Sequence, residues 1–216
     1  MNVLEHLEPK SVFRFFEEMC AIPHGSRNTK AVSDWCADFA RTRGLEYHQD
    51  GDNNIIIIKE AAPGYEAAPP VILQGHLDMV CEQTADCQKD MSREGLDLAV
   101  DGDFVYAKGT TLGGDDGIAV AMALALLDAK DLPCPRLEAV LTVDEEIGLL
   151  GAASIDVTPL KGRQMLNLDS EAEGIFTVSC AGGNNSACLL PLTRAPFDGA
   201  GVTVAVGGLT GGHSGA

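Results

Sequence analysis

The segment from residue 117 to residue 129, GIAVAMALALLDA, constrains the fold of this chain more than any other part of it. Its length and composition are typical of a helix, but it is apolar almost all the way round instead of on one face. A helix of this kind is stable only when other elements cover it on several sides. The segment therefore predicts a helix at the centre of a layered fold.

Strand and helix patterns alternate around this segment. Two amphipathic patterns predict helices, one from Ser11, as its cap, to Ile22, and one from Thr29 to Arg43 that ends at Gly44. Both helices are expected to cover a sheet. Apolar runs at 55–59 and 70–74 predict strands that are buried on both faces. A DG pair predicts a hairpin turn near 101–103, and LEAVLTVDEE, LLGAASI and QMLNLD predict a strand, a short helix and a strand.

This order of elements predicts an α/β fold, specifically a three-layer α/β/α sandwich with a mixed sheet. From residue 184 the pattern changes to the strand-like segments NNSACLLPL and GVTVAVGGL. We expect a domain boundary near Gly183. Residues 1–183 would form most of one domain, and residues 184–216 the beginning of a second, incomplete α+β domain.

The charge balance excludes several functions. Lys and Arg number 15 and Asp and Glu 32, so the formal net charge is −17. Nucleic acids and anionic bilayers carry the same sign, so we expect neither as a partner. The N-terminus has acidic residues and no long apolar run, which is unlike a secretion signal or a membrane span. With seven cysteines but no CxxC pair, the chain is predicted to be cytoplasmic with free thiols.

One histidine stands where open α/β sheets place their ligands. His76 follows the strand VILQG, at its carboxyl end. Residues two apart in extended backbone face the same way, so Asp78 is placed to accept the second ring N–H of His76. A carboxylate in that position orients a metal-bound imidazole. The ordinary alternative is a surface histidine beside a loop acid.

Acidic residues follow at three further junctions. Asp115 and Asp116 open the central apolar helix, where a buried acid needs a partner. Glu145 and Glu146 end the strand of LEAVLTV, and neighbouring strand residues point to opposite sides, so one could bind a metal while the other acts as a general base. Asp169 closes the strand QMLNL. Favourable placement at a helix start or a charged loop end would explain each acid singly.

Together, one histidine and several carboxylates predict a dinuclear zinc site, with manganese or cobalt as alternative metals. A last candidate, His213, lies among glycines in GLTGGHSG. Glycines permit close approach of a substrate, so His213 could polarise a substrate oxygen, although a histidine in a flexible turn is the ordinary alternative.

Six stretches, in this order, resemble the zinc metallopeptidase superfamily that includes aminoacylases, carboxypeptidase G and peptidase T, and most of all its aminoacyl-histidine, or cytosolic non-specific, dipeptidases. They are MCAIPHGS, VILQGHLDMVCE, AKGTTLGGDDGIAVAMALALL, LTVDEEIGLLGA, LNLDSEAEG with CAGG, and GLTGGHSG. Together they cover nearly the whole chain.

The resemblance implies a role for each candidate residue. The metal ligands would be His76 and Asp169 for one zinc, Glu146 for the second, and Asp115 for both. Asp78 would orient His76, and Glu145 would be the general base. A cis peptide commonly follows the bridging aspartate in this family. These dipeptidases usually have asparagine where this chain has Asp116, which adds a negative charge near the metals.

The resemblance also implies a function. The full-length protein would hydrolyse dipeptides with a free N-terminus, Xaa-His among them, as a homodimer formed through a lid domain. Residues 1–183 would be the N-terminal part of the catalytic domain and 184–216 the start of the lid. His213 would reach the partner subunit's active site. Relatives supply a last zinc-binding histidine after the lid, so we expect an inactive fragment. An aminoacylase, a tripeptidase or a non-catalytic metal-binding fragment are the alternatives.

Overall fold

The computed structural model describes residues 3–170, 174–179 and 186–205. The chain divides into two compact units, Met1–Ser170 and Glu171–Ala216. The predicted boundary at Gly183 lies outside the described residues. The predicted domain extents, 1–183 and 184–216, therefore stay predictions.

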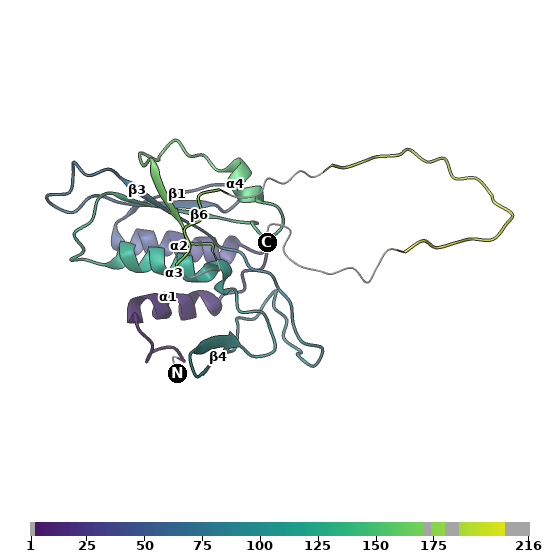
Figure 1. Ribbon diagram of the computed structural model, residues 1–216, viewed down its shortest axis with the longest axis horizontal. Coiled ribbons are helices and arrows are strands. Elements are labelled where there is room, and N and C mark those ends of the chain that lie inside the picture. Colours follow the sequence, from purple (N-terminus) through teal and green to yellow (C-terminus); the bar gives the residue numbers. More distant parts are fainter. Residues whose placement is uncertain (1–2, 171–173, 180–185, 206–216) are drawn as a thin grey trace. The chain divides into compact units, whose positions relative to one another are not determined.

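The first unit contains a five-stranded mixed sheet with the strand order β1-β2-β6-β3-β7 (Figure 1). The strands are β1 Glu46–Gln49, β2 Ile55–Lys59, β3 Val71–His76, β6 Leu137–Thr142 and β7 Gln164–Asn167. Strand β3 is parallel to both β6 and β7, whereas β2 is antiparallel to β6 and to β1. The carboxyl ends of β3, β6 and β7 therefore meet at one edge of the sheet. A separate hairpin is formed by β4 Leu98–Asp101 and β5 Phe104–Ala107, as predicted.

Among the described residues, three of the four helices lie on the same side of the sheet (Figure 1). The helices are α1 Lys10–Cys20, α2 Lys30–Arg43, α3 Gly114–Asp128 and α4 Leu150–Ser154. Helix α3 packs against β3 and β6 on one side and against α1 on the other. This position explains why its sequence is apolar all the way round. The expectation that α1 covers the sheet directly is wrong, because α1 packs mainly on α3.

Both faces of the sheet are buried at its central strands, β2, β6 and β3. In β2, Ile55 and Ile57 belong to the large core under α1, α2 and α3, whereas Ile56 and Ile58 belong to a smaller cluster on the opposite face. That smaller cluster is closed by Ile155, next to α4, and by residues just beyond it. Burial of alternate isoleucines on opposite faces is what a strand between two layers requires. The predicted α/β sandwich with a mixed sheet is thus confirmed.

Three local expectations need correction. Ser11 lies inside α1, and the residue at the N-cap is Pro9. Strand β1 was not expected, because its EYHQ sequence has no apolar alternation and all four of its side chains are exposed. The strand-like pattern after residue 184 forms no strand among residues 186–205. The expected stop of α2 is confirmed, since Gly44 adopts a left-handed conformation with φ of 67°.

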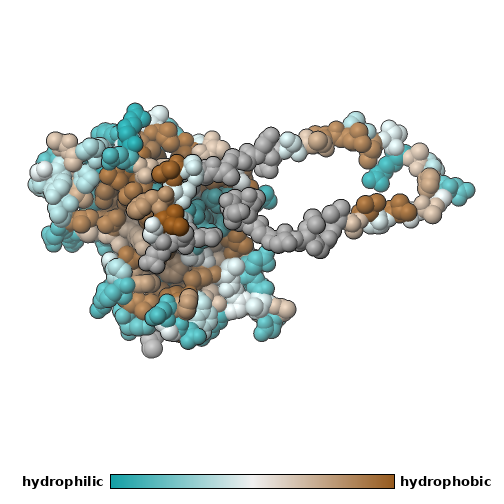
Figure 2. Space-filling view, in the orientation of Figure 1, coloured by the Kyte–Doolittle hydropathy of each residue, from teal (hydrophilic) through white to brown (hydrophobic). Residues whose placement is uncertain are grey.

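The surface of the first unit exposes several apolar side chains in the view of Figure 2. At the sheet edge, Met165 and Leu166 of β7 are 60% and 53% exposed, so neither face of this strand is covered by described residues. Among the described residues, no helix is long and apolar enough to cross a membrane.

Candidate metal centre

The centre is built around His76, the last residue of β3. Its side chain is buried, and its Nδ1 lies 2.9 Å from the main-chain oxygen of Asp78 and 3.5 Å from Asp78 Oδ1. The main-chain oxygen is therefore the nearer acceptor, where the carboxylate was expected. A histidine that donates through Nδ1 keeps the lone pair of Nε2 for a metal.

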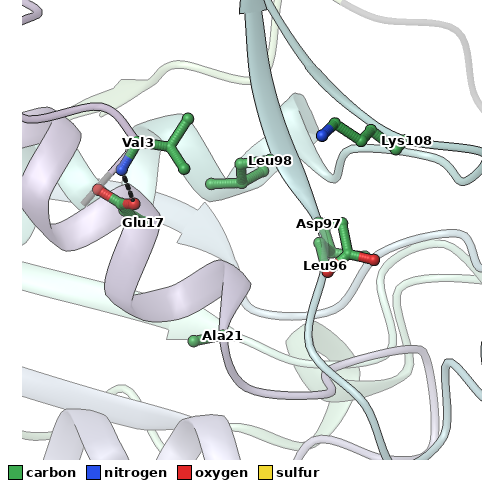
Figure 3. A pocket seen from close by; sticks show the side chains of 7 residues that line it. All are labelled: Val3, Glu17, Ala21, Leu96, Asp97, Leu98 and Lys108. Atoms are coloured by element: carbon green, nitrogen blue, oxygen red, sulfur yellow. Dashed lines mark hydrogen bonds between the residues drawn. The ribbon is translucent and has the colours of Figure 1, made fainter. Parts of the chain in front are cut away.

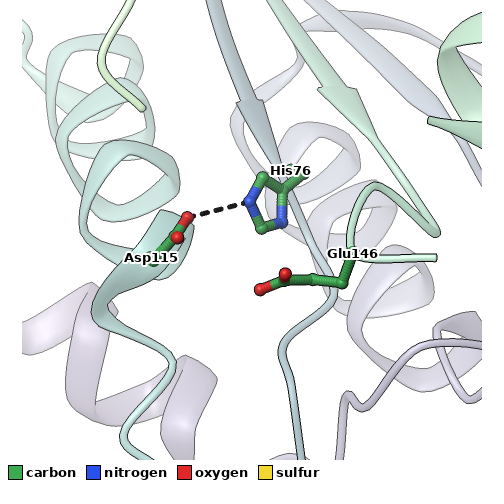
Figure 4. A group of neighbouring side chains, drawn as sticks. All are labelled: His76, Asp115 and Glu146. Carbon is green, nitrogen blue, oxygen red and sulfur yellow. Dashed lines mark hydrogen bonds and ion pairs between the residues drawn. The ribbon is translucent and has the colours of Figure 1, made fainter. Parts of the chain in front are cut away.

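Carboxylates converge on Nε2 of His76 from three segments. Asp115 Oδ1 lies 3.1 Å away, Glu145 Oε2 3.9 Å and Asp169 Oδ2 4.0 Å. His76, Asp115 and Glu146 also form a group whose ligand atoms all lie within 4.8 Å of one another (Figure 4). The structure thus brings together the four residues that the sequence predicts as metal ligands.

The start of α3 turns its two aspartates in different directions. Asp115 and Asp116 have non-helical backbone angles, and the peptide bond between them is cis, as the resemblance implies. The side chain of Asp115 points toward His76 (Figure 4). Asp116 is 1% exposed, and its Oδ2 accepts the main-chain N–H of His76 at 3.3 Å. Asp116, where the resemblance implies asparagine, is therefore buried directly against the end of β3.

The turn after β6 carries the other two acids. Strand β6 ends at Thr142, so Glu145 and Glu146 lie beyond it, and the strand alternation used to separate their roles does not apply. The carboxylate of Asp78 positions them instead. Its Oδ1 accepts the N–H of Glu145 at 3.0 Å, and its Oδ2 accepts the N–H of Glu146 at 3.4 Å.

The crowding of like charges changes the pKa of several groups. Burial raises the pKa of Asp116 to about 7, and nearby Asp169 and Asp115 act in the same direction. Burial and neighbouring acids also raise the pKa of Glu145 and of Glu146. Buried acids in such a group are stabilised by a cation.

The one imidazole cannot balance these acids. Burial lowers the pKa of His76, but Asp78, Asp116 and Glu145 together raise it to about 10. Even a protonated His76 leaves more negative than positive charge among these side chains. Nitrogen and carboxylate ligands in this combination suit zinc, and the oxygen-rich part also suits manganese. The residues present therefore fit a divalent cation.

A pocket of about 300 Å³ opens beside the ligand atoms. It is lined by Val80, Thr111, Leu112, Gly113, Gly114, Asp115 and Glu146. The acids form one part of its wall, and Val80 and Leu112 form an apolar part. A substrate with a polar group at the metal centre and a small apolar group beside it would fit this lining.

A second pocket, of about 400 Å³, lies between the end of α1 and the β4–β5 hairpin (Figure 3). Its lining residues are Val3, Glu17, Ala21, Leu96, Asp97, Leu98 and Lys108. The carboxylate of Glu17 accepts the main-chain N–H groups of Val3 and Leu4. Its only lining acid besides Glu17 is Asp97, which pairs with Lys89, so this pocket has no cluster of free ligands.

Two further outcomes concern single residues. His213 lies outside the described residues, so its role stays a prediction. Sequence reasoning gave no role to Ser26, whose Oγ donates to Asp78 Oδ2 at 2.8 Å. The stretch MCAIPHGS that contains Ser26 was matched to the family as a whole, but its residue types alone indicate no chemistry.

Comparisons with known proteins agree with the motifs. No family model matches the chain. The cytosol non-specific dipeptidase of Escherichia coli (strain K12) is 37% identical over 219 residues, which is 100% of this chain and 45% of that protein. The chain therefore spans less than half the length of this relative.

Solved structures show the same similarity. The aminoacylhistidine dipeptidase from Vibrio alginolyticus matches with a TM-score of 0.77 and 38% identity, over 79% of this chain and 35% of that one. A tripeptidase from Staphylococcus aureus matches with a TM-score of 0.62 and 20% identity, over 76% of this chain and 44% of that one, which shows the shared fold alone. The resemblance that the motifs predict is thus confirmed: this chain is similar in sequence to the cytosol non-specific dipeptidase of Escherichia coli, and in sequence and fold to the aminoacylhistidine dipeptidase from Vibrio alginolyticus.

Proposed function

We propose that this chain carries the metal-binding part of a dinuclear zinc dipeptidase that hydrolyses dipeptides with a free N-terminus, including Xaa-His dipeptides. The observation that carries the proposal is the convergence of Asp115, Glu145 and Asp169 within 4.0 Å of Nε2 of His76. The names of the E. coli and Vibrio relatives support the dipeptide substrate. A small peptide is thus the proposed partner, together with a second copy of the chain.

The ligands would be His76 and Asp169 for one ion, Glu146 for the second, and Asp115 for both. When bound, zinc lowers the pKa of a water molecule and polarises a carbonyl oxygen. Asp78 would keep the ring of His76 oriented through the contacts at Nδ1. Manganese or cobalt are the alternative metals, because oxygen ligands accept them too.

Glu145 would act as the general base. Its carboxylate lies among the ligands, 3.9 Å from His76 Nε2, and is partly buried. Burial raises its pKa toward the working range of a general base, which must take a proton from water and return it to the leaving amine. The N–H of Glu145 bonds to Asp78, which keeps the carboxylate near the ligands. His213 would stabilise the substrate oxygen in the partner's site.

Zinc titration of the chain, and hydrolysis assays of the full-length protein with a carnosine-like dipeptide, a tripeptide and an N-acyl amino acid, test the proposal. We expect zinc binding and a preference for the dipeptide, with hydrolysis lost in Glu145→Ala. The matched control is Glu94→Ala, an exposed acid whose carboxylate accepts the main-chain N–H of Asp90. Preference for the other substrates would favour a tripeptidase or an aminoacylase. Unchanged hydrolysis in Glu145→Ala would remove the base from the mechanism.

A second candidate is a metal-binding piece without turnover. The observation that favours it is the coverage of the relatives, since the chain spans 45% of one and 35% of the other. Zinc binding without hydrolysis of any of the three substrates would support this candidate over the first.

A further inference from the structure

We propose that Ser26 is a positioning residue of the metal centre, whose hydroxyl holds the Asp78 carboxylate so that the turn with Glu145 and Glu146 stays at the metal ligands. This inference rests on the proposed function and adds to it a residue outside the ligand set. Ser26 belongs to the stretch MCAIPHGS, to which neither the motifs nor the proposed mechanism gives a role.

The Asp78 carboxylate is the point where three segments meet. Its Oδ2 accepts the hydroxyl of Ser26 at 2.8 Å, and its two oxygens accept the N–H groups of Glu145 and Glu146 at 3.0 and 3.4 Å. Asp78 is 1% exposed, so bulk solvent has little access to its carboxylate. The orientation of this carboxylate thus decides where the turn sits, and the bond from Ser26 is the shortest of the three.

The backbone holds Ser26 in place independently of the acids. Residue Gly25 forms a parallel bridge with Met79, the N–H of Met79 donates to His24 O at 3.2 Å, and the N–H of Ser26 donates to Met79 O at 3.4 Å. A Cβ at Gly25 would lie 2.5 Å from Sγ of Cys81, so a larger residue at this position would require the Cys81 side chain to move. Ser26 is therefore a fixed donor.

A second contact links the same segment to the same turn. The N–H of Arg27 donates to Asp144 Oδ1 at 2.6 Å, next to Glu145 in sequence. Arg27 and Asp144 both have positive φ, 66° and 55°. Residues 26 and 27 thus contact the acidic turn through Asp78 and through Asp144. These two contacts connect the segment between α1 and α2 to the turn that carries the proposed ligand Glu146.

Removal of the hydroxyl should weaken metal binding without unfolding the chain. Loss of an outer partner of a metal ligand typically costs 10- to 100-fold in metal affinity. Ser26 acts through Asp78, so we expect the lower end of that range, a loss of about tenfold for Ser26→Ala. Ser26→Thr keeps a hydroxyl at the same carbon and should restore most of the affinity.

The experiment measures zinc affinity by competition with a chromophoric chelator, and thermal unfolding of the metal-free protein, for the whole chain and its variants. The matched control is Thr158→Val, which removes a hydroxyl that donates to Asp156 Oδ2 at 3.0 Å on the surface. We expect about tenfold weaker binding for Ser26→Ala, near-normal binding for Ser26→Thr and Thr158→Val, and a similar unfolding midpoint for all four proteins.

Two results would overturn the inference. Unchanged zinc affinity in Ser26→Ala would show that Asp78 needs no such donor. Equal losses of affinity in Ser26→Thr and Ser26→Ala, with lowered unfolding midpoints in both, would show a purely structural role. If the unaltered chain binds no zinc, the proposed function fails as well, and the two failures are therefore distinguishable.

Discussion

Strand β6 has acids near both of its ends, and they are surrounded differently. Glu138, near the start, is fully buried, and its carboxylate accepts the Nε–H of Arg136 at 2.7 Å and the main-chain N–H groups of Lys161 and Gly162 at 2.9 Å each. Glu145 and Glu146, beyond the other end, face further carboxylates and a single imidazole. One end supplies its own positive charge, and the other has an excess of negative charge.

The two environments shift pKa values in opposite directions. Burial alone would raise the pKa of Glu138, but Arg136 and the two N–H groups lower it overall. At the other end, burial raises the pKa of Glu145 and Glu146, and neighbouring acids add to the effect. A buried acid with complete partners stabilises the fold, whereas a group of acids without them lowers stability until a cation binds.

The largest expected effect on the unfolding free energy is at the start of β6, where Arg136 balances the charge of Glu138. Glu138→Ala leaves Arg136 buried without its main partner, and breaking a buried pair in this way costs about 3 to 5 kcal/mol of unfolding free energy. Urea denaturation measures the loss. The control is Glu60→Ala, because Glu60 also pairs with Arg136 but is exposed, so its removal should cost less than about 1 kcal/mol. Equal losses in both variants would contradict the contrast between the two ends.

At the acidic end the effect appears only with metal. At a zinc concentration of one hundred times Kd, binding should stabilise the chain by about 2.7 kcal/mol, and His76→Ala should abolish this gain. The measurement is the difference in unfolding free energy with and without zinc, which removes any cost of the substitution itself. His48→Ala is the control, since this histidine is exposed and contacts Glu46. A full zinc gain in His76→Ala would place the metal elsewhere.

Much of this contrast is visible in the sequence, because the acids of the metal centre stand at the ends of apolar strands. Parallel strands bring their carboxyl ends together, so His76 at the end of β3 and Asp169 just after β7 were predicted to meet. The all-apolar pattern of residues 117–129 likewise predicted a central helix. These predictions succeed because period and position along the chain decide them.

Other features depend on contacts that no local pattern records. The tie between Ser26 and Asp78 joins residues 52 positions apart, and serine is common in loops. The balance of Glu138 depends on main-chain N–H groups of residues 161 and 162, which any residue type except proline could supply. Strand β1 has no apolar alternation because its side chains are exposed. Such features follow from tertiary packing and could not be predicted.

The pH dependence of the unfolding free energy should reveal the stabilisation that the Glu138 carboxylate contributes at the start of β6. The pKa of Glu138 is lowered in the folded state, so its stabilisation is fully present above the unfolded pKa and is lost as pH falls through the folded pKa. Glu138→Gln removes the charge and should cost about 2 kcal/mol at pH 7. The deficit should shrink below about pH 4. Denaturation at several pH values measures it. A deficit that stays constant down to pH 2 would refute the assignment to this carboxylate.

The same change from acid to amide should act in the opposite direction at the metal centre. Asp116 is buried among acids and accepts the N–H of His76, and asparagine keeps that acceptor while it removes the charge. In the metal-free chain, Asp116→Asn should therefore raise the unfolding free energy, by about 1 kcal/mol at pH 7.

Denaturation of both amide variants side by side, without and with zinc, is the sharpest comparison. Glu138→Gln should be less stable than the unaltered chain in either condition. Asp116→Asn should be more stable than the unaltered chain only without zinc, because a bound cation supplies the positive charge that balances the Asp116 carboxylate. A loss of stability in metal-free Asp116→Asn would mean that its carboxylate is already balanced, and the two ends of β6 would then not differ as their contacts indicate.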